Sequence, residues 1–191
     1  FGTLAAGGTI VFPDAAQIRE PGHWLDLVQR ERVTVWNTVP AMMKMLIEYK
    51  SALQGVQKGT LRLVLLSGDW LPLDLPDQIR GHYDAEVVSL GGATEASIWS
   101  ILYPIGRVDP KWESIPDGYP MLNQQFHVLN DELKPCPDYV SGHLYIGGEG
   151  LSDGYWHDPE NTAKSFITHP VTGERLYRTG DIGYFHPDGH I

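Results

Sequence analysis

The sequence has 191 residues, 42% of them hydrophobic and 20% charged, which is typical of about one soluble globular domain with a real core. A formal net charge of -10, with no run of Lys or Arg, argues against a nucleic-acid or anionic-membrane partner. No apolar stretch approaches the ~20 residues of a membrane span, and the single cysteine, Cys136, excludes an intramolecular disulfide, so we expect a cytoplasmic protein.

The first half of the chain alternates between expected strands and helices. Short apolar or β-branched runs predict strands over 8–12, 33–39, 61–66 and 86–90. Apolar residues at helical spacing predict helices around 24–28, from Pro40 onward, and over 73–83. This order of elements is typical of a parallel-type sheet with covering helices, an α/β fold.

After Glu95 the pattern becomes mostly β. Expected strands lie at 97–103, 125–129, 143–147, 176–178 and 183–185. One helix is expected near Asp158-Pro159-Glu160, where Asp caps and Pro occupies the first turn. We therefore expect a small antiparallel, β-barrel-like region in the second half.

Both ends of the chain resemble cut ends. The sequence opens inside an apolar segment without a start methionine. It closes on the turn residues 187–190, which predict a returning strand beginning at Ile191. We expect a piece of a larger protein, bounded by an artificial truncation, a disordered segment or an inserted domain.

The segment 89–97 is the strongest candidate site. Two glycines, Gly91 and Gly92, follow the expected strand 86–90, and in open α/β sheets ligands bind beyond such strand ends. Thr94 can donate to a phosphate oxygen, and Glu95 can hold magnesium together with phosphate oxygens and water. The alternative is a Gly-Gly turn followed by a solvent-facing Thr and Glu.

Two further polar segments have competing interpretations. Asp181, directly after Thr179-Gly180, can accept hydrogen bonds from ribose hydroxyls, or it belongs to a simple turn. The glycine-rich segment 147–150 lacks a following Lys-Ser/Thr, so we expect a turn rather than a phosphate loop. The eight histidines show no metal-ligand spacing.

Three segments, 90–95, 142–155 and 177–181, occur in the order and rough spacing of the adenylate-forming superfamily. They resemble nonribosomal peptide synthetase adenylation domains more closely. The resemblance implies part of the large N-terminal subdomain: residues 1–103 as the second α/β sheet portion and 104–191 as the barrel-like portion. The small C-terminal subdomain would be absent.

The resemblance implies a two-step reaction that uses ATP and Mg²⁺. A carboxylate attacks the α-phosphate to give an acyl-adenylate, and the phosphopantetheine thiol of a carrier protein then takes the acyl group. Thr94 and Glu95 would be catalytic, with Thr94 on phosphate and Glu95 on magnesium, and Asp181 would bind the ribose. The implied nucleotide-cleft residues are Gly68, Gly92, Ala93, Thr94 and Asp181.

The sequence departs from the family pattern in two places, and family motifs lie outside it. Gly91 stands where an aromatic residue is common, and Ser89 stands where an asparagine often contacts adenine. The phosphate loop would precede Phe1, while an arginine, the hinge and the catalytic lysine would follow Ile191. We expect this fragment alone to be inactive.

The resemblance also suggests a substrate and partners. The implied amino-acid pocket consists of Asn37, Leu65, Ser67, Leu90, Ile98 and Trp99. This narrow set resembles cysteine-activating domains, including those of thiazoline-forming siderophore synthetases, and implies L-cysteine as the substrate. A peptidyl carrier domain, and a condensation or cyclization domain in the same parent chain, are the implied partners.

Two other functions stay open. An acyl-CoA synthetase or aryl-acid ligase shares these motifs but activates an acid without an amino group. A non-catalytic remnant would bind only a nucleotide or a partner.

Overall fold

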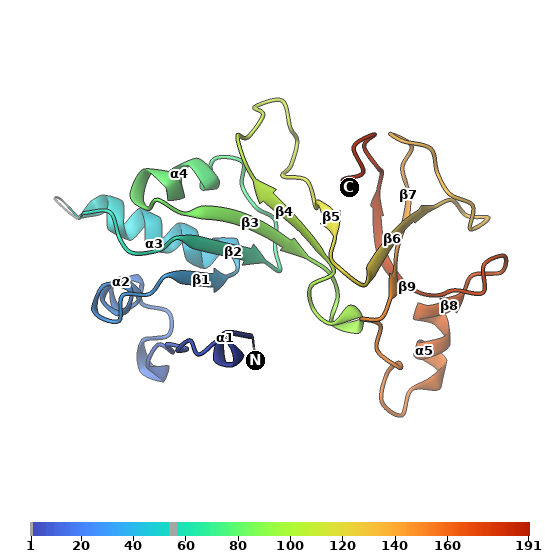
Figure 1. The fold of residues 1–191 in the computed structure, drawn as a ribbon, viewed down its shortest axis with the longest axis horizontal. Helices are drawn as coiled ribbons and strands as arrows, with labels where there is room; N and C mark the ends of the chain where they lie inside the picture. The colour runs from blue at the N-terminus through green and yellow to red at the C-terminus, as the bar shows by residue number, and fades with distance from the viewer. Residues whose placement is uncertain (1, 54–56) are drawn as a thin grey trace. The chain divides into compact units, whose positions relative to one another are not determined.

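A computed structural model describes residues 2–53 and 57–191 (Figure 1). The chain forms two compact units, residues 1–88 with 105–115 and residues 89–104 with 116–191. The strand order in one sheet is β1 (Val35–Thr38), β2 (Leu63–Ser67), β3 (Glu86–Gly91), β4 (Ile101–Ile105) and β5 (Tyr119–Pro120). In the other sheet it is β6 (Gln124–Leu129), β7 (Gly142–Gly148), β9 (Arg175–Gly183) and β8 (Phe166–Thr168). The assignment of 1–103 and 104–191 to two portions of an adenylation core stays a prediction.

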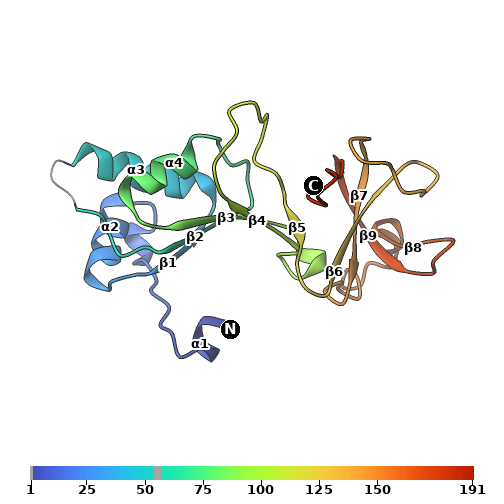
Figure 2. The same cartoon turned by 45° about the horizontal axis from the view of Figure 1, so that its top comes forward.

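The first unit is built on two parallel strands. β1 (Val35–Thr38) pairs with β2 (Leu63–Ser67), and Asn37 lies opposite Leu65 in the register. The helices of this unit are α1 (Gly2–Ala5), α2 (Pro21–Arg30), α3 (Pro40–Ala52) and α4 (Leu75–His82), with a 3₁₀ helix at Ala15–Gln17. Figure 2 shows α3 and α4 along one face of these strands.

Apolar side chains of the helices and of β2 form the core of this unit. Met43, Leu46, Val64, Leu66 and Ile79 are at most 1% exposed. Alternation along β2 explains the burial, because Val64 and Leu66 share one face and Leu65 and Ser67 share the other. In the described part of the chain, no helix combines the length and the apolar character needed to cross a bilayer.

β3 (Glu86–Gly91) runs from the first unit into the second. A 3₁₀ helix (Thr94–Ala96), β4 (Ile101–Ile105) and β5 (Tyr119–Pro120) follow, and β4 and β5 pair antiparallel. The second sheet contains β6 (Gln124–Leu129), β7 (Gly142–Gly148), β8 (Phe166–Thr168) and β9 (Arg175–Gly183). All three of its strand pairs are antiparallel.

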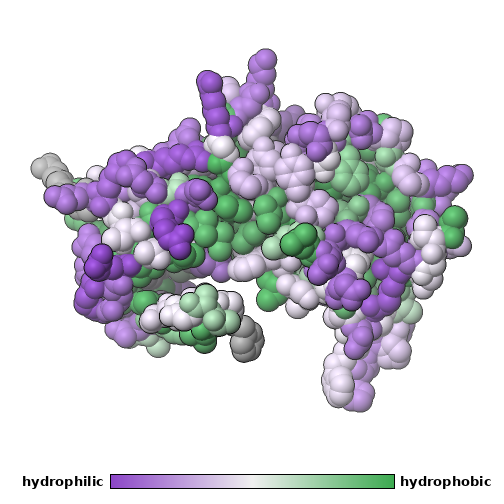
Figure 3. Space-filling view, viewed as in Figure 1, coloured by the Kyte–Doolittle hydropathy of each residue, from purple (hydrophilic) through white to green (hydrophobic). Residues whose placement is uncertain are grey.

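Helix α5 (Pro159–Ser165) confirms the start predicted near Asp158. The Asp158 side chain accepts a hydrogen bond from the Asn161 backbone nitrogen at 3.0 Å, as an N-cap residue does. α5 has no buried residue, and its region at the lower right of Figure 3 is correspondingly purple and white.

Several predicted strands differ in the structure. Residues 8–12 have no regular secondary structure, with Ile10 43% and Phe12 78% exposed, so burial does not stabilise a strand there. The strand predicted over 97–103 begins only at Ile101, because Ser97 and Ile98 adopt φ of 62° and 72°. The predicted strands 176–178 and 183–185 are replaced by one strand, β9.

The turn predicted at the chain end is present, and the returning strand predicted to begin at Ile191 stays a prediction. A turn at 186–190 is closed by hydrogen bonds between the backbones of His186 and His190 and of Gly189 and His186. Ile191 exchanges two backbone hydrogen bonds with Gly118, at 2.9 and 3.1 Å. The residue after the turn therefore contacts the segment before β5.

Candidate functional site

The loop between β3 and β4, residues 92–100, is closed by backbone hydrogen bonds. The Ser100 nitrogen donates to Gly91 O at 2.8 Å, and the Ile98 nitrogen donates to Ala93 O at 3.0 Å. Gly92 has φ of 141°, and a Cβ there would lie 2.6 Å from Ile98 O and 2.7 Å from Ser100 N. The packing of the loop therefore requires glycine at position 92, independently of any ligand.

The middle of this loop has an uncommon backbone conformation. Ser97 and Ile98 both have positive φ, and Ile98 is β-branched, so its conformation is strained. The Ser97 hydroxyl donates to Gly150 O at 2.8 Å, which fastens the loop to the segment after β7. The Ile98 side chain is 63% exposed.

Glu95 is held by neighbours from two distant segments. The Tyr155 hydroxyl donates to Glu95 Oε1 at 2.6 Å, and the Ser152 nitrogen donates to Glu95 O at 2.8 Å. The Tyr155 bond, with a smaller contribution from the Tyr177 hydroxyl, lowers the pKa of the Glu95 carboxyl below its ordinary value. Glu95 is therefore ionised at neutral pH, and Thr94 beside it is exposed.

This donor set suits magnesium bound through a nucleotide. Among the residues that the structure describes, no three His, Cys, Asp or Glu side chains gather into a cage for a metal. Magnesium commonly uses one or two protein carboxylates and takes its other oxygens from phosphate and water. One ionised carboxylate, Glu95, next to an exposed hydroxyl, Thr94, fits that arrangement.

Asp181 lies in an irregular part of β9. Arg178 pairs with Tyr145 and Ile182 with His143, so residues 179–181 bulge opposite a single residue of β7. Gly180 has φ of 89°, and the Asp181 nitrogen donates to the Thr179 hydroxyl at 3.0 Å. Asp181 itself is exposed.

Asp181 also affects a second carboxyl group. Desolvation raises the pKa of Asp117 above its ordinary value, and the charge of Asp181 raises it further. The bulge therefore presents a carboxylate close enough to another acid to perturb it. That Thr94, Glu95 and Asp181 contact one nucleotide stays a prediction.

The residues predicted to line the amino-acid pocket lie in both units. In the first unit, Asn37, Leu65 and Ser67 share the less buried face of β1 and β2. Gly68 follows directly, with φ of 82°. In the second unit, Leu90 is 7% exposed in β3, and Ile98 and Trp99 belong to the loop 92–100.

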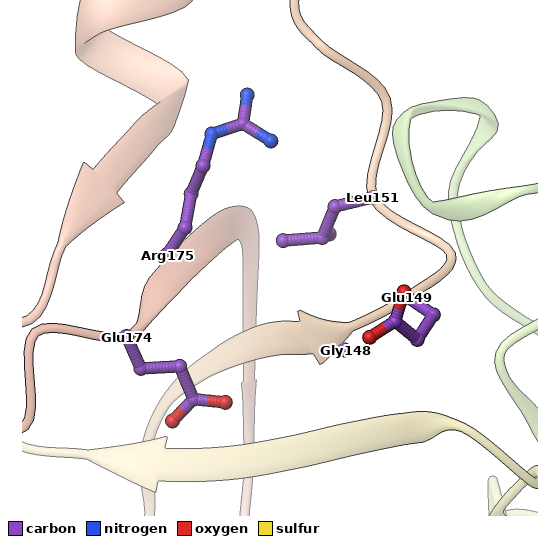
Figure 4. A pocket seen from close by; sticks show the side chains of 5 residues that line it. All are labelled: Gly148, Glu149, Leu151, Glu174 and Arg175. Carbon is purple, nitrogen blue, oxygen red and sulfur yellow. The ribbon is translucent and has the colours of Figure 1, made fainter.

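A shallow hollow of about 360 Å³ lies elsewhere in the second unit, lined by Gly148, Glu149, Leu151, Glu174 and Arg175 (Figure 4). Glu174 and Arg175 are adjacent in sequence, and their charged groups point in opposite directions. The Glu149 nitrogen donates to Asn123 O at 3.0 Å, and a Cβ on Gly148 would lie 2.3 Å from that oxygen. These contacts favour the predicted turn over a phosphate loop.

Sequence reasoning missed the two phenols beside Glu95. Tyr155 and Tyr177 belong to two of the recognised segments but received no role. Alternation along β9 does not single out Tyr177, because Leu176 and Tyr177 are both buried, at 1% and 8% exposure, in separate clusters. Tyr155 lies in an irregular segment, so no periodic pattern reveals its direction.

Comparison with known proteins places these features in a family. A family model described as AMP-binding enzyme matches residues 1–156. The chain is 46% identical over 192 residues to bacitracin synthase 1 of Bacillus licheniformis, covering 100% of this chain and 4% of that protein. It is 45% identical over 192 residues to pyochelin synthetase PchF of Pseudomonas aeruginosa, covering 100% of this chain and 11% of that protein.

Solved structures agree with these relatives. The nonribosomal peptide synthetase FmoA3 in its AMPPNP-bound form gives a TM-score of 0.94 at 44% identity, covering 100% of this chain and 21% of that chain. Its α-methyl-L-serine-AMP-bound form gives a TM-score of 0.93 at 43% identity, covering 99% of this chain and 22% of that chain. The chain thus spans less than a quarter of each of these proteins. The predicted fold class is confirmed, and the chain belongs to the family of AMP-binding enzymes.

Proposed function

We propose that this chain is part of an amino-acid adenylation domain. An oxygen of the substrate carboxylate attacks the α-phosphorus of ATP, the α–β phosphoanhydride bond breaks, and pyrophosphate leaves with the electron pair. The phosphopantetheine thiol of a carrier domain then loses its proton and attacks the acyl carbon, and AMP leaves. The relatives named as synthases and synthetases, and the AMPPNP and α-methyl-L-serine-AMP bound to FmoA3, support this assignment.

The observation that carries the proposal is the ionised Glu95 carboxylate in the loop that follows β3. We propose that Thr94 donates to a phosphate oxygen, that Glu95 holds the magnesium ion, and that Asp181 accepts from the ribose hydroxyls. Gly68, Gly92 and Ala93 would line the nucleotide cleft. When bound, magnesium supplies positive charge against the charge that develops on the phosphate oxygens.

We propose L-cysteine as the amino acid. Asn37 and Ser67 offer polar contacts for a small side chain, while Leu65, Leu90, Ile98 and Trp99 would limit the volume of the pocket. Serine is the second candidate, since FmoA3 binds the adenylate of α-methyl-L-serine at 43% identity to this chain. The two side chains differ by sulfur against oxygen, so a measurement of specificity is needed.

ATP–pyrophosphate exchange by the full-length protein tests the substrate. We expect cysteine to give the highest kcat/KM among cysteine, serine, threonine and valine. A clear preference for serine or valine contradicts the cysteine assignment and leaves adenylation standing. Exchange with a free aryl or fatty acid, and with none of the amino acids, would instead favour an aryl-acid ligase or an acyl-CoA synthetase.

A charge-removing substitution tests the site itself. Glu95→Gln keeps the size of the side chain and is expected to lower exchange about 100-fold, a typical loss when one stabilising group for the transition state is removed. Glu149→Gln is the matched control, because Glu149 is an exposed glutamate of the hollow in the same unit. Equal activity of the two variants would contradict the role of Glu95.

The partners follow from the second step. We propose a peptidyl carrier domain as the acceptor and a condensation or cyclization domain in the same parent chain, in the cytoplasm. Mass spectrometry of the carrier after incubation with ATP and cysteine is expected to show a mass increase of one cysteinyl group. An unmodified carrier, with exchange intact, would indicate a different acceptor.

A further inference from the structure

The environment of Glu95 contains two phenols that the proposed reaction does not use. Tyr155 donates to Glu95 Oε1 at 2.6 Å. Burial raises the pKa of the Tyr177 hydroxyl, and the nearby charge of Glu95 raises it further. The Tyr177 hydroxyl therefore stays protonated at neutral pH, while Tyr155 is the phenol that donates to the carboxylate.

The rings of these phenols are fixed by one aromatic residue. Phe166 lies between them, with ring centroids 5.9 Å from Tyr155 and 5.2 Å from Tyr177. Phe166 and Tyr177 are buried together with Ala96, the residue after Glu95. The loop that carries Glu95 is thus packed on the same cluster that contains Tyr177 and contacts Tyr155.

The backbone of Tyr155 is fixed by helix α5. The Tyr155 nitrogen donates to Thr162 Oγ1 at 2.9 Å, and this hydroxyl donates to Asp158 O at 2.7 Å. Gly154 has φ of 141°, and a Cβ there would lie 2.4 Å from Thr162 Cγ2. Only glycine allows the chain to pass this close to the helix.

Arg175 of β9 fixes the other side of the same segment. Its guanidinium donates to Ser152 O at 2.7 Å and to Asp153 O at 2.9 Å, and lies 4.4 Å from the centre of the Phe166 ring. Two carbonyl bonds and a cation–π contact leave this segment little freedom to shift. The segment 152–155, which contacts Glu95 through Ser152 and Tyr155, is therefore fixed both to α5 and to β9.

We propose that Tyr155 is a positioning residue for Glu95, holding its carboxylate in one orientation for the metal–nucleotide complex. This inference rests on the proposed function of Glu95. Tyr155 acts through Glu95, and Oε1 is engaged by the phenol before the nucleotide arrives. Partners that orient a metal-binding carboxylate change metal affinity by roughly 10–100-fold when removed.

The test uses Tyr155→Phe in the full-length protein, since phenylalanine keeps the packing on Phe166 and deletes one hydroxyl. Calorimetry is expected to show about tenfold weaker binding of Mg²⁺·AMPPNP. The Mg²⁺ concentration for half-maximal exchange rises by a similar factor. The KM for the amino acid stays unchanged.

Tyr145→Phe is the matched control. Tyr145 is 4% exposed in β7 and packs in a separate cluster with Leu129 and Leu176, so its loss of a hydroxyl leaves Glu95 untouched. We expect wild-type Mg²⁺·AMPPNP affinity and wild-type dependence of exchange on Mg²⁺. A loss of Mg²⁺·AMPPNP affinity as large as that of Tyr155→Phe would mean that removing any buried phenol weakens binding, and would overturn the inference.

The outcomes separate the inference from the proposed function. If Glu95→Gln abolishes the metal-dependent binding while folded Tyr155→Phe keeps it unchanged, the function stands and the positioning role is wrong. If Glu95→Gln binds and reacts as wild type, both are wrong. If Tyr155→Phe does not fold, Thr162→Val is the deciding variant. A severalfold weaker Mg²⁺·AMPPNP affinity of Thr162→Val supports the positioning role of Tyr155, and an unchanged affinity overturns it.

Discussion

The loop 92–100 and the bulge 179–181 both carry an acidic residue of the candidate site, but they are held in opposite ways. Backbone atoms of the loop occupy the space beside Gly92, and Glu95 accepts a hydrogen bond from the Tyr155 hydroxyl. The bulge is open, since a Cβ on Gly180 would meet no atom within 4 Å, and Asp181 is exposed. The difference shows that the Glu95 carboxylate is held by a hydrogen bond inside the unit, while the Asp181 side chain faces solvent.

The largest expected effect comes from filling the closed loop. Gly92→Ala places a methyl group 2.6 Å from Ile98 O at φ of 141°. Backbone strain of roughly 1–3 kcal/mol and overpacking of roughly 1–3 kcal/mol should together lower the free energy of unfolding by about 3 kcal/mol or more. Urea unfolding of the purified protein measures this. A loss below about 1 kcal/mol would mean that the loop is not closed as described.

The matched substitution in the bulge should cost less. Gly180→Ala adds the same methyl group into open space at φ of 89°. Only the left-handed backbone penalty of roughly 1–2 kcal/mol remains. The same urea titration compares both variants, and the contrast between the regions fails if Gly180→Ala is as destabilising as Gly92→Ala.

A smaller effect follows from the ionisation of Glu95. Its folded pKa lies below the ordinary value of 4.5, so it adds stability that is present above 4.5 and lost as the pH falls through the lowered pKa. Glu95→Gln should therefore flatten the decline in stability on acidification. Thermal unfolding between pH 6 and pH 3 measures the slope, and an unchanged slope would contradict the phenol bonds.

Asp117, beside the bulge, should show the opposite sign and the smallest effect. Its folded pKa is raised, so its contribution is present below the ordinary value of 3.8 and lost as the pH rises through the raised pKa. Asp181→Asn removes the neighbouring charge and should lower the pKa of Asp117. NMR titration of the Asp117 side-chain carboxyl measures the shift. Desolvation keeps part of the elevation, so a full return to 3.8 is not expected.

Local patterns in the sequence were enough for several elements. Short apolar or β-branched runs placed β2, β6 and β7 within one or two residues, and the Asp158-Pro159 pair located the start of α5, because strand propensity and helix caps depend on near neighbours. The motif order identified the family before any contact was known. The strand predicted over residues 8–12 is wrong, because an apolar run becomes a strand only where another strand pairs with it.

From the sequence by itself, the side-chain chemistry of Thr94, Glu95 and Asp181 led to the prediction of a nucleotide site. Only the tertiary structure decided how Glu95 is held, because its donor Tyr155 lies 60 residues further along the chain. It also decided that Gly92 is required by packing, since the atoms that exclude a side chain belong to Ile98 and Ser100. Hydrogen bonds and steric contacts between distant residues depend on the folded path of the backbone, which no local pattern specifies.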